Sequence, residues 1–153
     1  MGHRVLKMKL IPLAAALLAA CALPALAQYN PPPERLTHVE GVVVNTHGDP
    51  VVGADVTLER DGKVIHSTRT GSQGEFEFAH AHGDYVFRVG RTQYSPAVLN
   101  VIVSDDLVAL AEHKKLYVIA GPGACEDECS TIVTSRREFE KALKKFSKQT
   151  GKE

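Results

Sequence analysis

Between residues 41 and 89, short segments that alternate apolar with polar residues are separated by Gly, Pro, Asp and Asn at nearly regular spacing. Successive side chains of a strand point to opposite faces, so each segment has one apolar face that must be covered. Five such strands in about fifty residues cannot cover these faces singly, so a second sheet has to pack on them. The pattern predicts a small antiparallel β-sandwich.

The turns and the apolar positions of these segments define the expected core. Asp61-Gly62 is the strongest hairpin signal, because this pair readily adopts the two-residue turn that joins antiparallel strands. Phe76 and Phe78 are expected to face inward, while the glutamates beside them face water. The residues expected to build the core are Val43, Val56, Leu58, Phe76, Phe78, Tyr85, Phe87, Leu99 and Val101.

Two further strands and a helix complete the predicted fold. Residues 97–103 and 116–120 favour a sixth and a seventh strand, and residues 107–114 fit either a short helix or a strand. In residues 135–148 a capping box, S-x-x-E, opens a helix whose apolar residues recur at i, i+3, i+4 and i+7. These stripe residues are Phe139, Ala142, Leu143 and Phe146.

The apolar stripe of the helix has two interpretations. Either it packs on the sandwich beside the sixth and seventh strands, or Phe139, Leu143 and Phe146 contact a protein partner or a membrane surface. We expect the first.

The spacing of glycines and core residues resembles that of a carboxypeptidase regulatory-like domain. The matching motifs are Gly41-x-Val43, Gly48-x-Pro50, Gly53-Ala54-x-Val56-x-Leu58, Gly74-x-Phe76-x-Phe78 and Gly83-x-Tyr85-x-Phe87-x-Val89. The resemblance covers roughly residues 37–104 and implies an all-β, seven-stranded antiparallel sandwich of transthyretin-like (prealbumin-like, Ig-like) type. It also implies a folding or binding accessory without catalytic residues. The C-terminal amphipathic α-helix lies outside the resemblance and is an addition to this sandwich.

The N-terminus has the pattern of a secretory signal peptide. Basic residues precede an eleven-residue apolar run that is too short to span a bilayer comfortably. Ala25-Leu26-Ala27 has the small-x-small form that predicts cleavage between Ala27 and Gln28. In the alternative reading, Leu18-Ala19-Ala20-Cys21 resembles a bacterial lipobox, and a lipidated Cys21 anchors the protein in the envelope.

The expected organisation has six parts. They are a signal peptide (1–27), a Pro-rich linker (28–36), the sandwich core (37–104), the last strand with a cysteine loop (105–134), the helix (135–148) and a tail (149–153). Residues 28–134 hold eight basic and fifteen acidic residues, a net charge of −7, whereas residues from 135 onward hold seven basic and three acidic ones, a net charge of +4. An acidic domain of this kind does not suggest a nucleic-acid partner.

Cysteines and histidines supply the candidate bonding and metal sites. Cys125 and Cys129 are expected to form a disulfide in an oxidising compartment. A metal site at these thiolates is the alternative, although a second ligand pair is missing. His80 and His82 would share a face of a strand, with His66 on a neighbouring one, which makes them candidate zinc or copper ligands. Surface histidines are the plainer interpretation.

The sequence favours binding over catalysis. No Ser-His-Asp constellation and no H-E-x-x-H motif is readable, and the Tyr-Arg-Gly-Ser ending of related transthyretin-like hydrolases is absent. A carbohydrate-binding module is the rival, but sugar faces stack on Trp or Tyr, and the chain has no Trp. With Tyr85 in the core, the sugar platform would rest on Tyr29, Tyr94 and Tyr117.

We therefore predict a secreted or periplasmic, non-enzymatic module without a cofactor that associates with another protein of the cell envelope. A carbohydrate-binding module, a small transthyretin-like hydrolase and a metal-binding protein remain the alternatives. Membrane attachment is expected only through a lipidated Cys21.

Overall fold

The computed structural model describes residues 31–106, 113–125 and 129–150. These residues all belong to one compact unit. The predicted signal peptide, its cleavage site and Cys21 lie outside the described residues, as do residues 107–112 of the ambiguous segment.

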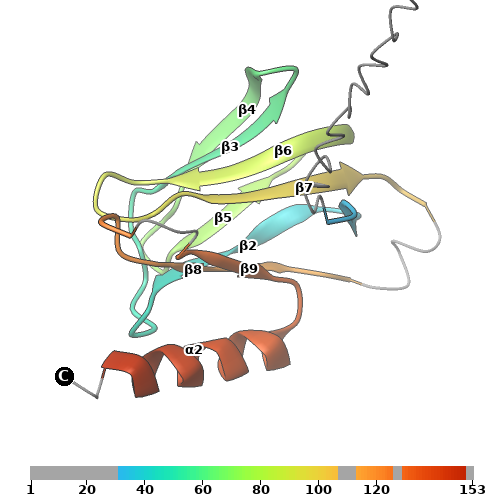
Figure 1. Ribbon diagram of the computed structural model, residues 1–153. Helices are drawn as coiled ribbons and strands as arrows, with labels where there is room; N and C mark the ends of the chain where they lie inside the picture. The colour runs from blue at the N-terminus through green and yellow to red at the C-terminus, as the bar shows by residue number, and fades with distance from the viewer. Residues whose placement is uncertain (1–30, 107–112, 126–128, 151–153) are drawn as a thin grey trace, which may run out of the picture. The chain divides into compact units, whose positions relative to one another are not determined.

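The described residues form nine strands in two mixed sheets and one C-terminal helix, so the chain is mostly β (Figure 1). The five-stranded sheet has the order β1-β7-β6-β3-β4 and the four-stranded sheet the order β5-β2-β8-β9. The bounds are β1 Glu34–Leu36, β2 Val39–Asn45, β3 Asp55–Arg60, β4 Lys63–Arg69, β5 Glu75–Phe78, β6 Gly83–Gly90, β7 Ala97–Val103, β8 Leu116–Ala120, β9 Thr131–Val133 and α2 Arg136–Thr150.

The expectation of seven antiparallel strands is wrong both in the number of strands, which is nine in the described residues, and in the direction of some of them. Strands β1 and β9 have only three residues each, too few to show an alternating pattern, and β1 begins inside the segment expected to be a Pro-rich linker. The pairs β1–β7 and β2–β8 are parallel. Both parallel pairs join segments far apart in the sequence, and no local pattern encodes such pairing.

The inter-sheet core is the one that the alternation predicts. Eight of the nine expected core residues are buried, and Leu99 is partly buried against them. The ring of Phe76 lies 5.4 Å from that of the fully buried Phe87, centroid to centroid. In β5 the two phenylalanines are buried and the two glutamates exposed, which confirms the predicted inward face.

Glycine is required for different reasons at two positions of the sandwich, Gly62 and Gly41. At the β3–β4 turn, Asp61 and Gly62 have φ values of 52° and 73°, as a two-residue hairpin with both central residues left-handed requires. At Gly41, a Cβ atom would overlap the backbone carbonyl of Leu116 and lie 2.8 Å from Cζ of Phe76. The parallel β2–β8 pair therefore needs glycine at this position.

A second, smaller apolar layer lies on the outer face of the four-stranded sheet. Val44 and Ile119 are buried, yet neither belongs to the inter-sheet core. Helix α2 lies along this face beside β8 and β9 (Figure 1). The Phe139 ring stacks on the Tyr117 ring, 5.0 Å between centroids.

The start of α2 and the side that it turns toward the sheet are those that the sequence predicts. The backbone N–H of Glu138 donates to Oγ of Ser135 at 3.2 Å, the N-terminal cap that the capping box predicts. Between residues 136 and 149 the four stripe residues are half-buried and all the others exposed. The helix lies beside the predicted seventh strand, β8, but the expected contact with the sixth strand is wrong because that strand, β7, belongs to the other sheet.

Candidate binding surfaces

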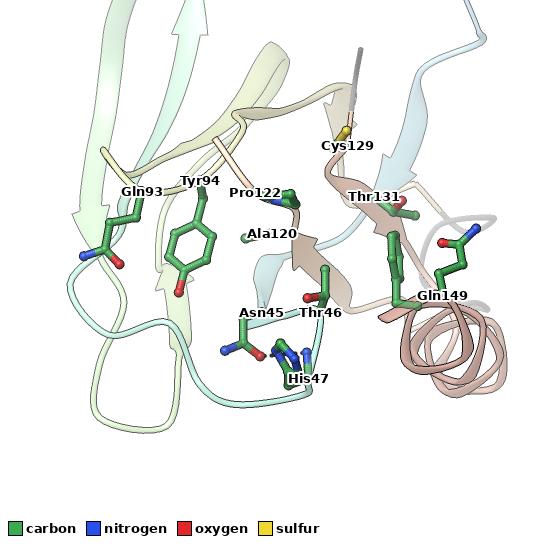
Figure 2. Close-up of a pocket in the computed structure, with 11 residues that line it drawn as sticks. Asn45, Thr46, His47, Gln93, Tyr94, Ala120, Pro122, Cys129, Thr131 and Gln149 are labelled. Atoms are coloured by element: carbon green, nitrogen blue, oxygen red, sulfur yellow. Dashed lines mark hydrogen bonds between the residues drawn. The ribbon is translucent and has the colours of Figure 1, made fainter. Parts of the chain in front are cut away.

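A groove of about 780 Å³ lies at the C-terminal end of α2 (Figure 2). Four segments bring its walls together: the turn after β2, the loop before β7, the end of β8 and the stretch that leads into β9. The lining residues are Asn45, Thr46, His47, Gln93, Tyr94, Ala120, Pro122, Cys129, Thr131, Phe146 and Gln149. None is an Asp, Glu, Lys or Arg, so the groove is suited to an uncharged ligand.

The turn after β2 is a preorganised wall. Oδ1 of Asn45 accepts the backbone N–H groups of His47 and Asp49, both at 2.9 Å, and so fixes the turn. A Cβ on Gly48 would lie 3.9 Å from Cδ1 of Leu143, so this turn packs against α2. The side chain of Asn45 is therefore occupied by its own backbone, while His47 is exposed.

The opposite wall is held by a hydroxyl and a disulfide. Oγ of Ser130 accepts the N–H of Gly121 at 3.0 Å and donates to the carbonyl of Ser95 at 2.6 Å. The expected disulfide joins Cys125 to Cys129, with the Cα atoms 6.2 Å apart. Such a bond is typical of an oxidising, non-cytoplasmic compartment.

Protein isolated from an oxidising compartment should carry no free thiol at Cys125 or Cys129. Alkylation followed by intact-mass measurement should show modification of this pair only after reduction. Because the loop is short, reduction is expected to lower the free energy of unfolding by only about 2 kcal/mol. Two alkylated cysteines in unreduced protein would contradict the disulfide and revive the thiolate metal site.

Among the three tyrosines considered for a sugar platform, only Tyr94 lines the groove. Tyr117 is covered by Phe139, and Tyr29 lies outside the described residues. The half-buried Tyr94 stands beside Gln93, and Gln149 lies at the far end of the labelled set (Figure 2). One aromatic ring with two amide side chains is a smaller platform than three rings, but it can hold a neutral polar ligand.

The three candidate metal-binding histidines do not come together. The expectation that His80 and His82 share a strand face is wrong, because β5 ends at Phe78. His82 lies 3.9 Å from a carboxylate oxygen of Asp105, and His66 makes an edge contact with the Tyr85 ring at 5.8 Å. Within the described part of the chain, no group of three or more His, Cys, Asp or Glu residues is placed to hold a metal ion.

A second candidate surface is the free edge of β4. The sheet edges are β1, β4, β5 and β9, and β4 with seven residues is longer than the other three, which have three or four. On β4, Val64 is 56% and Ile65 45% exposed. Unpaired backbone groups and exposed apolar side chains on one edge are the features that an added strand from a partner uses.

Comparison with known proteins identifies the central part of the chain. The family model of the carboxypeptidase regulatory-like domain matches residues 38–111. This segment is a carboxypeptidase regulatory-like domain. The matched residues contain β2 to β7, and hence the β4 edge, whereas β1, β8, β9 and α2 lie outside them.

Solved structures and curated proteins give two further comparisons. A solved structure of Klebsiella pneumoniae 5-hydroxyisourate hydrolase is similar at 17% identity and a TM-score of 0.47, covering 65% of this chain and 99% of that one. No curated protein matches the chain. Within the part of the chain that the structure describes, none of the helices has the length and apolar character of a membrane span.

Sequence reasoning named Tyr94 but missed the groove around it. The groove residues come from segments separated by up to about a hundred positions, and no spacing rule joins them. The hairpin signal at Asp61-Gly62 predicted the β3–β4 pair, but it could not show that β4 is an edge strand, because the strand order depends on contacts between distant segments.

Proposed function

We propose that this chain is a secreted or periplasmic, non-enzymatic module that binds another protein through the outer edge of β4. The observation that carries the proposal is the seven-residue edge strand with two exposed large apolar side chains. Among the described strands, β4 is the last strand of its sheet and pairs with β3 alone, while α2 lies beside β8 and β9 of the other sheet (Figure 1).

The expected compartment and the residues that line the groove support a secreted, non-enzymatic binding module. The Cys125–Cys129 disulfide and the signal-peptide pattern of residues 1–27 both suit an oxidising, extracytoplasmic location. The groove offers His47 as its one titratable imidazole and no carboxylate, and its cysteine is held in the disulfide. This lining favours a binding role over catalysis.

Site-specific photocrosslinking in the native host tests the proposal. A photoreactive residue in place of Ile65 should give one dominant protein adduct in the envelope fraction. The matched control is Val98, an equally exposed apolar residue (47%) on the interior strand β7. When Val64→Lys is combined with the photoreactive residue at position 65, the adduct should disappear, because a charge on this edge opposes strand pairing. Identical adducts from both positions, or none from position 65, would refute an edge-mediated partner.

A carbohydrate module is the second candidate, favoured by Tyr94 with Gln93 and Gln149 along the groove. In this case a glycan array should show specific retention that Tyr94→Ala removes and Tyr117→Phe keeps. Retention that Tyr94→Ala leaves unchanged would exclude the groove as the sugar site.

A further inference from the structure

The face of α2 that points away from the sheet carries a continuous basic stripe. Arg137, Lys141, Lys144 and Lys148 recur at i, i+4, i+7 and i+11, and all four side chains are exposed. At 3.6 residues per turn these positions share one face, diametrically opposite the apolar stripe that packs on the sheet. We call this set the basic stripe. It is about 16 Å long, from eleven residue steps of about 1.5 Å.

The charge of the basic stripe is not neutralised locally. In the described residues no ion pair is formed by any of its four members, and the pair that α2 does form, Arg136 with Glu140 at 3.2 Å, lies beside it. Lys145 adds a fifth exposed cation next to the stripe. Holding several unpaired like charges in one line serves no packing purpose, because none of them contacts the sheet.

The apolar side of the helix is already occupied. Phe139 stacks on Tyr117, and the other stripe residues are half-buried against the sheet, so α2 does not offer an apolar face for insertion into a bilayer. On the side away from the sheet, α2 presents a row of exposed cations. A row of this kind is complementary to a planar surface that carries many phosphates.

We propose that the basic stripe of α2 holds the domain on a bilayer that contains anionic phospholipids, by electrostatic contact without insertion. The charge distribution supports this orientation. Residues 28–134 have a net charge of −7, so an anionic membrane repels the sandwich and attracts only the helix with its net +4. A membrane is favoured over a nucleic acid because the signal-peptide pattern and the disulfide both indicate the envelope.

Vesicle co-sedimentation of the full secreted chain tests the stripe. Vesicles of equal parts phosphatidylglycerol and phosphatidylcholine should retain the protein, and vesicles of phosphatidylcholine alone should not. Each cation near an anionic surface strengthens binding roughly fivefold, so Lys144→Gln with Lys148→Gln should weaken it roughly 25-fold. Raising the salt to about 1 M, where the screening length is about 3 Å, should release the wild type.

The matched control neutralises two exposed basic residues outside both the helix and β4, Arg91→Gln with Lys115→Gln, and should bind the vesicles as the wild type does. Equal retention by neutral and anionic vesicles, or by the Lys144/Lys148 variant and the wild type, would overturn the proposal. So would self-association in the absence of lipid that the same variant abolishes. That result would assign the stripe to the acidic sandwich of a second copy, whose residues 28–134 have a net charge of −7.

Discussion

Replacing Phe76 with alanine is expected to lower the free energy of unfolding by about 3–5 kcal/mol, most of the stability of a small domain. The Phe76 ring is 5% exposed and lies between the Phe87 ring and the backbone at Gly41. Strand backbone walls the site on the Gly41 side, so the cavity left by the ring cannot collapse. Urea denaturation of the variant and the wild type measures the loss.

The matched control for Phe76 is its neighbour on the same strand. Glu77 is exposed and lies opposite another glutamate, Glu40, so Glu77→Ala should change the stability by no more than about 0.5 kcal/mol. If the two substitutions cost the same, the inward face of β5 is misassigned.

Removing two side chains of the apolar stripe, Phe139→Ala with Leu143→Ala, should cost about 3 kcal/mol. Both side chains are half-buried, so each should contribute roughly half of the 3 kcal/mol of a fully buried side chain. An isolated helix of this length is marginal in water, so α2 depends on its contact with the sheet. Hydrogen exchange should show protected amides across residues 139–146 in the wild-type monomer and rapid exchange there in the double variant, with β3 and β6 still protected.

The control for the helix uses its other face. Lys141→Ala with Lys145→Ala removes exposed side chains and adds good helix formers, so protection of residues 139–146 should remain. Rapid exchange of these amides in the wild-type monomer, slowing only when an envelope extract or anionic lipid is added, would show that the apolar stripe serves a partner instead.

The sequence predicted the strands, turns and helix that are specified by residues within the element itself. Phe76 and Phe78 alternate with charged residues, and Asp61-Gly62 specifies its own turn, so the strands and the hairpin could be placed correctly. The helix had both a cap at Ser135 and a stripe of the right period. The same periodicity of the exposed lysines also encodes the basic stripe.

The features that could not be predicted depend on contacts between distant segments. Nothing local indicates that Gly41 lies beside Leu116 in a parallel pair, or that Leu36 enters the core from a three-residue strand. The position of α2 on β8 and β9 depends on which strands share a sheet, and the groove depends on that position. The prediction that His80 and His82 share a strand face was wrong because β5 ends at Phe78, before both histidines.

Hydrogen exchange on the whole chain, alone and bound to the protein that crosslinks at position 65, tests the proposed function most directly. In the monomer, the outward-pointing amides of residues 63–69 should exchange rapidly, because β4 has a neighbour on one side only. In the complex we expect these amides to slow, with residues 93–94 and 146–149 of the groove unchanged. Slowing confined to the groove, with the amides of residues 63–69 as fast as before, would contradict binding at the β4 edge.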